Sequence, residues 1–205
     1  MIPDIRTAAA ELELAGRMNP GPWVEHSRNV GIAARNIAER VPGMDAERAH
    51  ILGMLHDIGR RVGIVDIPTH VAEGYRYAMA QGWDEVARIC MTHSYPRGAA
   101  DLGDSPREME IRAYLTACEY DDYDRLIVLC DSLAADFGFC ILEKRFVDVT
   151  RRYGFWPNTI DFWNEVFYIK EDFDARMGSS VYDVLPDIGR TTLLCPPPWK
   201  PPVRS

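Results

Sequence analysis

Four histidines and two aspartates recur along the first two thirds of the sequence, in an order that suits a divalent metal. The six positions are His26, His56, Asp57, His70, His93 and Asp131. Imidazole and carboxylate groups are the ligands that borderline and hard divalent metals accept in proteins. Each position taken alone has a simpler interpretation, such as a hydrogen-bonded core histidine, but one shared site explains all six together. The sequence therefore predicts a metal centre.

Asp131 gives the most direct physical indication of a buried charge. It lies in the apolar segment LIVLCDSLA, where a carboxylate is costly to bury without a partner. A metal or a buried arginine would supply that partner, whereas a solvent-facing position on an amphipathic helix would need none. The doublet His56-Asp57 also follows an apolar run, ILGML, which places it at the edge of a core. His50 lies six residues before His56, so helical geometry directs it away from the doublet and leaves it outside the predicted site.

Helical periodicity dominates the chain, so helices must position these side chains. Apolar residues at three- and four-residue steps predict helices over residues 23–41, 46–56, 70–80 and 84–92. Asp45 and Thr69 are the expected caps of the second and third of these. Further helices are expected over residues 107–119, 124–137, 140–153 and 159–177, while strand-type alternation is scarce. The fold class is therefore predicted to be all-α, with the candidate ligands on helices or at helix ends.

The ligand order, together with LGMLHDIGRR around the doublet and LIVLCDSLA around the final aspartate, resembles the HD-domain superfamily of metal-dependent phosphohydrolases, in particular small HDIG-type bacterial members of unassigned substrate. The resemblance covers roughly residues 20–140 and implies a helical bundle with a central metal cleft. The segment HVAEGYRYAMAQGWDEVARICMTHS is similar to the two-histidine insertion of members that bind two metals. The HHE and DGxGYP signatures of the cyclic-dinucleotide phosphodiesterases are absent, which disfavours that activity. The dinucleoside-tetraphosphate hydrolases are closer in ligand order, but the stretch between Asp57 and His70 is short here.

The resemblance also implies a role for each candidate ligand. The first metal would be held by His26, His56, Asp57 and Asp131. The second would be held by His70 and His93, with Asp57 bridging the two. The expected cofactor is one or two divalent ions, and the ligand types do not distinguish Fe, Mn, Ni, Zn or Mg. The implied reaction is attack of a metal-activated water on a small phosphoester, for which a nucleotide is one candidate.

Three arginines are the candidates for binding the phosphate of such a substrate. Arg60 and Arg61 follow the doublet directly, and Arg97 lies four residues after His93. A guanidinium presents a planar fork of donors that matches phosphate oxygens. Arg60 is assigned with Asp57 to the catalytic set, and Arg60, Arg61 and Arg97 to substrate binding. An ordinary surface charge is the alternative interpretation of each arginine.

Two other functions use similar ligands and stay open at this point. Some HD-fold enzymes resemble the six-ligand pattern but bind a di-iron centre and oxidise carbon with dioxygen. Other HD domains are non-enzymatic modules that bind a ligand. Loss of ligands would favour a binding module, and all six ligands are present in this sequence.

Composition limits the remaining partners. The chain has 205 residues and carries 23 Lys and Arg against 31 Asp and Glu, for a formal net charge of -8. Because nucleic acids and anionic membranes are bound by clustered cations, neither a broad nucleic-acid surface nor a membrane surface is expected. No apolar run approaches the roughly 20 residues of a membrane span, and the N-terminus has no signal pattern, so a cytoplasmic location is expected.

The length fits one HD-like domain over residues 1–205, with a core at about 20–140, helices over 140–180 and a Pro-rich tail over 186–205. The five cysteines form no CxxC pair and are expected to be reduced, mostly buried thiols. An aromatic set is expected to pack in the core, with a homodimer interface or a cleft wall as alternatives. It comprises Trp156, Phe162, Trp163, Phe167 and Tyr168.

Overall fold

The computed structural model describes residues 1–194 and confirms an all-α fold. Its α-helices are α1 (Ile5–Met18), α2 (Trp23–Ala38), α3 (Ala46–Leu55), α4 (Ile67–Ala80), α5 (Asp84–Thr92), α6 (Pro106–Thr116), α7 (Asp122–Leu133), α8 (Leu142–Tyr153), α9 (Thr159–Met177) and α10 (Ile188–Leu193). Three short 3-10 helices are η1 (Ile58–Val62), η2 (Gly98–Asp101) and η3 (Val181–Val184), and one antiparallel hairpin is formed by β1 (Ala134–Ala135) and β2 (Gly138–Phe139).

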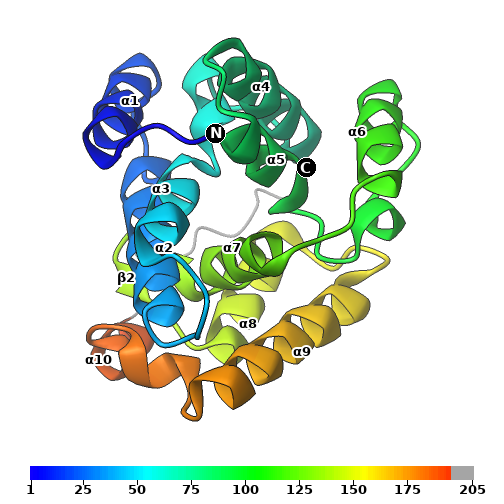
Figure 1. The fold of residues 1–205 in the computed structure, drawn as a ribbon. Coiled ribbons are helices and arrows are strands. Elements are labelled where there is room, and N and C mark those ends of the chain that lie inside the picture. Colours follow the sequence, from blue (N-terminus) through cyan, green and yellow to red (C-terminus); the bar gives the residue numbers. More distant parts are fainter. Residues whose placement is uncertain (195–205) are drawn as a thin grey trace.

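The helices surround α7, which lies in the middle of the molecule (Figure 1). Figure 1 shows α2 and α3 on one side of α7, α4 and α5 above it, and α8 and α9 below it. One large apolar core joins these helices to α1, and Leu12, Leu52 and Leu129 are among its fully buried side chains. A second, smaller apolar cluster lies under α6 and includes Val71, Ile111 and Leu115.

Side-chain caps set where the helices near the candidate ligands begin. Asp45 accepts a hydrogen bond from the amide of Arg48 at 3.0 Å, which confirms it as the cap of α3. The prediction that Thr69 caps α4 is wrong. Asp66 caps α4 instead and accepts from the amide of Thr69 at 2.9 Å. Pro68 is tolerated in the first turn because its missing amide would have no partner there, so α4 begins at Ile67.

Three further segments differ from the expectation. α1 was not among the predicted helices, although Ala8, Leu12 and Ala15 are buried along one face of it. The helix expected over residues 124–137 ends at Leu133, because the chain then reverses in the hairpin of β1 and β2. Part of the expected tail, Ile188–Leu193, forms the helix α10. The segment CPPPWKPPV lies outside the described residues.

Two glycines allow the elements beside the candidate ligands to approach closely. A Cβ at Gly53 of α3 would lie 2.8 Å from the Cα of Gly31 on α2, which is closer than real Cβ atoms approach. A Cβ at Gly59 of η1 would collide with the carbonyl oxygen of His70 and the backbone nitrogen of Gly74 on α4. Only glycine fits at these two positions, so the α2–α3 and η1–α4 contacts depend on them.

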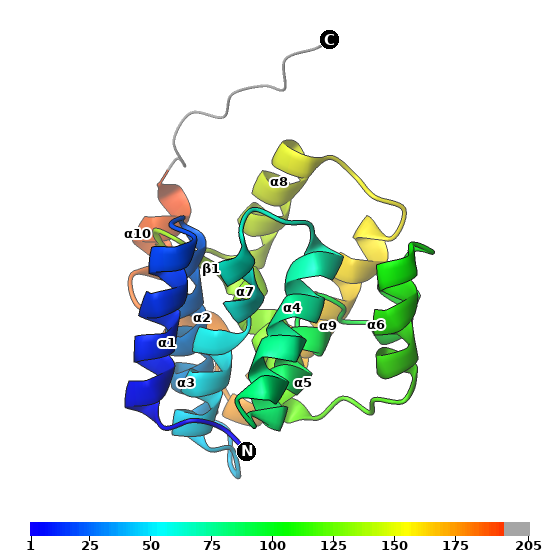
Figure 2. The same ribbon diagram turned by 90° about the horizontal axis from the view of Figure 1, so that it is seen from above.

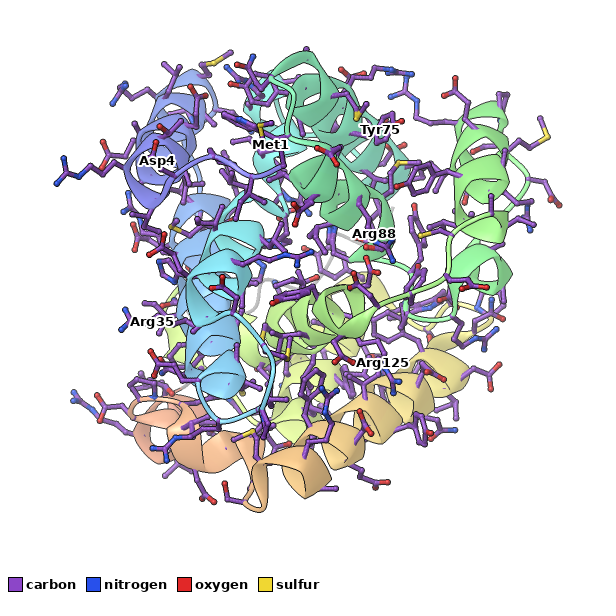
Figure 3. All side chains as sticks on the ribbon, in the orientation of Figure 1. Met1, Asp4, Arg35, Tyr75, Arg88 and Arg125 are labelled. Atoms are coloured by element: carbon purple, nitrogen blue, oxygen red, sulfur yellow. The ribbon has the colours of Figure 1, made fainter. Side chains whose placement is uncertain are left out.

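A buried ion pair joins α5 to α7. Asp124 is fully buried and accepts from Nε of Arg88 at 3.1 and 2.9 Å through its two carboxylate oxygens. The hydroxyl of Thr92 donates to the same carboxylate at 2.8 Å. Figure 3 shows Arg88 between these helices. Because His93 directly follows α5 and Asp131 lies in the last turn of α7, this pair fixes two candidate ligands relative to each other.

Other expectations concern packing and thiols. Phe162, Trp163 and Phe167 of α9 pack around Phe146 of α8, with the Phe146 and Trp163 rings stacked at 5.4 Å, as expected for core packing. Tyr168 and Trp156 are exposed. The four described cysteines are free, and Cys118 is the one of them that is not buried. Within residues 1–194, every helix is too short or too polar to cross a lipid bilayer.

Candidate metal centre

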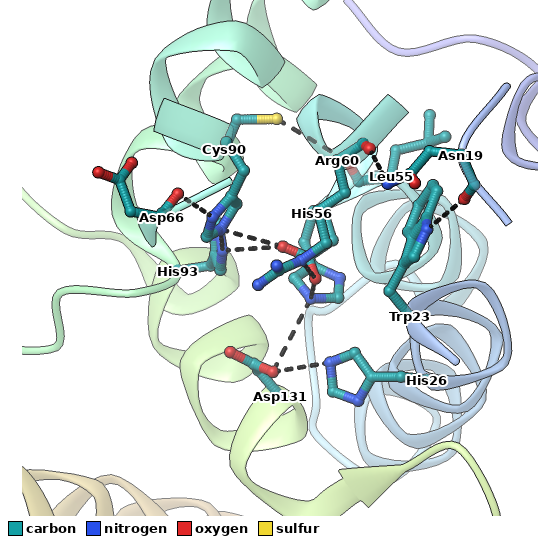
Figure 4. A network of polar contacts seen from close by, with 12 residues as sticks. Asn19, Trp23, His26, Leu55, His56, Arg60, Asp66, Cys90, His93 and Asp131 are labelled. Carbon is teal, nitrogen blue, oxygen red and sulfur yellow. Dashed lines mark hydrogen bonds and ion pairs between the residues drawn. The ribbon is translucent and has the colours of Figure 1, made fainter. Parts of the chain in front are cut away.

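The six candidate ligands come from five segments that converge on one point. His26 lies in the first turn of α2, and His56 and Asp57 follow the last residue of α3. His70 lies in the first turn of α4, His93 directly follows α5, and Asp131 lies near the end of α7. Each of these segments therefore brings one or two candidate ligands to the centre from at or near a helix end. Figure 4 shows the resulting network of polar contacts.

His26, His56 and Asp131 form one side of the centre. Nε2 of His26 lies 2.9 Å from Oδ1 of Asp131, and Nε2 of His56 lies 3.8 Å from the same oxygen. The rings of His26 and His56 meet edge to face, with centroids 5.3 Å apart. The His56 side chain is 1% exposed and the Asp131 side chain 31% exposed, so solvent reaches the centre from the Asp131 side.

Asp57, His70 and His93 form the other side. Oδ1 of Asp57 lies 3.1 Å from Nε2 of His70 and 3.6 Å from Nε2 of His93. The two Nε2 atoms are 3.3 Å apart. Oδ2 of Asp57 lies 3.8 Å from Nε2 of His56, so the two oxygens of this carboxylate face the two sides of the centre.

Backbone carbonyls hold three of the histidines in one orientation. Nδ1 of His56 is 2.7 Å from the carbonyl oxygen of Gly53. Nδ1 of His70 is 3.2 Å from that of Asp66, and Nδ1 of His93 is 3.0 Å from that of Ile89. A carbonyl only accepts, so each Nδ1 carries the proton and each Nε2 presents a lone pair to the centre. This is the arrangement by which metal-binding histidines are fixed in proteins.

At His56, His70 and Asp57, burial and neighbouring charges shift the pKa values in the directions that metal binding requires. Burial lowers the pKa of His56 to about 4, against the attraction of Asp57 and Asp131. Burial also lowers the pKa of His70. Burial alone would raise the pKa of Asp57, but the histidines around it outweigh that effect and lower it. The centre therefore favours ionised carboxylates and, at His56 and His70, neutral imidazoles, which are the forms that bind metals.

The pKa values of His93 and Asp131 are shifted in opposite directions. Burial opposes protonation of His93, but the nearby Asp57 carboxylate outweighs it and raises the pKa of His93. For Asp131, burial is outweighed by the hydrogen bond to His26 and the nearby imidazoles, so the pKa of Asp131 is lowered. A cation in the centre would stabilise the Asp131 carboxylate as the imidazoles do, and it would compete with a proton for His93.

The donor set fits divalent metal ions. Three groups each bring ligand atoms within 4.8 Å of one another: His26, His56 and Asp57; His56, His93 and Asp131; and Asp57, His70 and His93. Nε2 of His56 and Oδ1 of Asp57 are buried without a hydrogen-bond partner in the described residues. An unpartnered buried polar atom is costly, and coordination to an ion would remove that cost. The protein therefore has His and Asp groups that could hold metal.

The predicted arginines are placed in different surroundings. Nε of Arg60 lies 2.5 Å from Oδ2 of Asp57, so Arg60 belongs to the centre. Arg61 points instead toward Glu11, at 3.7 Å, and its guanidinium lies over the ring of Tyr77 at 3.8 Å. The structure brings Arg60 to the six candidate ligands and directs Arg61 toward α1 and α4.

Arg97 is engaged with two carboxylates outside the centre. Its Nε lies 3.4 Å from Asp101 and its Nη1 lies 2.6 Å from Asp161. It also borders a surface hollow that Tyr120 and Arg125 line. The contacts of Arg97 therefore tie the segment after His93 to α9.

The contacts of the Gly53, Asp66 and Ile89 carbonyls were not predicted from the sequence. Backbone acceptors carry no signature of their own, because any residue type supplies one. The one available signal is spacing. Each carbonyl comes three or four residues before the histidine it contacts, which is the contact distance on a helix.

The chain matches a known protein family. The HD domain family model matches residues 23–136, which include all six candidate ligands. No curated protein and no solved structure matches the chain. The match covers more than half of the sequence and agrees with the helical fold and with the convergence of the His and Asp side chains. The chain therefore belongs to the HD-domain family.

Proposed function

We propose that this protein is a metal-dependent phosphohydrolase that acts on a small phosphoester. The observation that carries the proposal is the convergence of six His and Asp side chains, with unpartnered ligand atoms, beside the guanidinium of Arg60. HD domains are generally metal-dependent hydrolases, which agrees with this assignment. A nucleotide is one candidate substrate.

Asp57 would hold two ions together. It is shared by the group with His26 and His56 and by the group with His70 and His93, and its two oxygens face opposite sides. Bound divalent ions would lower the pKa of a coordinated water and polarise a phosphoryl oxygen. The chain's own contribution is to fix the ligands and to favour the neutral form of His56 and His70.

Arg60 would orient both Asp57 and the substrate. Its side chain is 33% exposed while Asp57 is 4% exposed, so the guanidinium lies between the buried carboxylate and solvent. Nδ2 of Asn19 donates to the carbonyl oxygen of Arg60 at 2.6 Å and fixes the backbone there. The free edge of the guanidinium is then available for a phosphoryl oxygen.

Charge balance favours an anionic substrate. Asp57 and Asp131 are the carboxylates of the centre, and Arg60 already offsets part of their charge. Two divalent ions would more than neutralise what remains. The loaded centre would be positive inside an acidic protein, which suits a small phosphorylated ligand and not an extended polyanion.

The test is phosphate release from a phosphoester panel by protein loaded in turn with Mn, Zn, Ni and Fe. The panel contains p-nitrophenyl phosphate and nucleoside mono-, di- and triphosphates. We expect metal-dependent release from at least one ester and none from the Asp57→Ala variant. A mixed-valent di-iron resonance signal that an organic substrate perturbs, with no phosphate release, would identify a di-iron oxygenase instead. Metal binding with neither result would indicate a ligand-binding module.

A further inference from the structure

The turn between α7 and α8 places the first turn of α8, which carries Arg145, beside the end of α7, which carries Asp131. α7 ends two residues after Asp131, and the hairpin of β1 and β2 then reverses the chain. The amide of Cys140 donates to the carbonyl of Leu133 at 2.8 Å, so the start of α8 lies next to the end of α7 (Figure 2). Arg145 lies in the first turn of α8 and outside the residues that match the family model.

Arg145 is half-buried and has no ion-pair partner among residues 1–194. Its neighbours Leu142 and Phe146 are buried in the core, and burial lowers the pKa of the Arg145 guanidinium. Asp131 is the group that acts most strongly against this effect. Arg60 and Arg97, by contrast, each form an ion pair with an aspartate.

The two aspartates whose charge acts on Arg145 already have other partners. Asp148, one turn further along α8, lies 3.7 Å from Nζ of Lys144. Asp131 contacts His26, and a metal ion in the centre would offset its charge. Arg152 lies seven residues after Arg145, which is two turns along the same helix face, and its charge adds to that of Arg145. In the metal-loaded protein this part of α8 would therefore carry uncompensated positive charge next to Asp131.

We propose that Arg145 binds a phosphoryl group of the substrate at the solvent-open, Asp131 side of the centre. This inference rests on the proposed function, and it assigns to Arg145 the anion-binding role that Arg61 and Arg97 cannot fill in their present contacts. A guanidinium supplies two parallel donors to a phosphoryl group, and a half-buried one forms stronger bonds than an exposed one because less water competes. The predicted ligand is a phosphorylated molecule with its anionic end between the ions and α8.

The test is a calorimetric titration of inorganic phosphate into metal-loaded protein. For Arg145→Gln we expect a Kd weaker by about 10- to 100-fold, as expected for loss of a charge-assisted hydrogen bond, with an unchanged metal content. Arg145→Lys keeps the positive charge but lacks the two parallel donors of a guanidinium. Its Kd for phosphate should therefore lie between those of Arg145→Gln and the wild type. Arg125→Gln is the matched control, because Arg125 is also a half-buried helical arginine without an ion pair in the described residues, but it lies beside Tyr168. It should bind phosphate like the wild type.

Three results would overturn the inference. They are an Arg145→Gln variant that binds phosphate within about twofold of the wild type, one that loses its metal, and a metal-loaded wild type that does not bind phosphate. Failure of the proposed function is distinguishable from these. If no ester of the panel is hydrolysed but phosphate binding still depends on Arg145, the anion site stands and the hydrolase assignment falls. If esters are hydrolysed with the same KM by Arg145→Gln, only the assignment of Arg145 falls.

Discussion

At the scale of single residues, Asp57 is the position on which the centre depends most. Its two oxygens face His56 on one side and His70 and His93 on the other, and its side chain is buried. No neutral residue can supply two anionic ligand atoms at one point. The remaining ligands are each confined to one side or shared through a single nitrogen.

Replacement of Asp57 tests this role. We expect Asp57→Ala to lose bound metal and to release phosphate more than about 100-fold more slowly, since even the outer partners of metal ligands contribute about 10- to 100-fold. Metal analysis and a phosphate-release assay measure the two effects on the same preparation. Full metal occupancy in the variant would refute the bridging assignment.

At the scale of elements, the close contact between η1 and α4 positions His70 against Asp57. A Cβ at Gly59 would meet the backbone of His70 and Gly74, and backbone cannot rotate aside. We expect Gly59→Ala to lower the free energy of unfolding by about 1 to 3 kcal/mol, as overpacking does, and to weaken metal binding at His70. Denaturant titration measures the first effect.

A second glycine supplies the control for that substitution. A Cβ at Gly189 of α10 would meet nothing within 4 Å. Gly189→Ala should therefore change stability by no more than about 1 kcal/mol. Equal effects of the two substitutions would show that the η1–α4 contact does not require glycine.

The ion pair between Arg88 and Asp124 also fixes two helices, α5 and α7, relative to each other. Arg88→Ala would leave the fully buried Asp124 without its cation, and we expect a loss of about 3 kcal/mol in the free energy of unfolding. Arg35→Ala removes an arginine whose pair with Glu39 is exposed, so it should cost less than about 1 kcal/mol. Similar costs for the two variants would mean that the buried pair does not hold α5 and α7 together.

The positions of several helices could be predicted from the sequence. Periodicity and the cap Asp45 located α3, and α5 and α9 have the expected bounds, because local pattern and burial agree there. The hairpin after Leu133 was missed because its four paired residues are too short for an alternating pattern. The contacts of Arg61, Arg97 and Arg145 could not be predicted, because the partner of a long side chain depends on the tertiary structure.

At the scale of the whole molecule, a net charge of -8 and an anionic substrate are compatible. The surface carries the excess acid, while two of the aspartates lie in the centre and would be neutralised by metal. Long-range attraction would be weak, so binding would depend on the centre and on Arg60 and Arg145 at short range.

Metal binding should also stabilise the molecule as a whole, because the ligands come from five separate segments. At a free metal concentration about 100 times the Kd, binding to the folded state adds about 2.7 kcal/mol, which corresponds to a rise in Tm of roughly 5 to 10 °C for a chain of this size. Differential scanning calorimetry with and without chelator measures the shift. An Asp57→Ala variant with an undiminished shift would show that the ions bind elsewhere.

If these six side chains hold two divalent ions, elemental analysis of metal-loaded, desalted protein will show a defined metal stoichiometry. His70→Ala removes a ligand of one side only, and His50→Ala removes a half-buried histidine outside the centre. We predict two equivalents in the wild type and in His50→Ala, and one equivalent in His70→Ala. A wild type that holds no metal, or a His70→Ala variant that still holds two equivalents, would contradict the account.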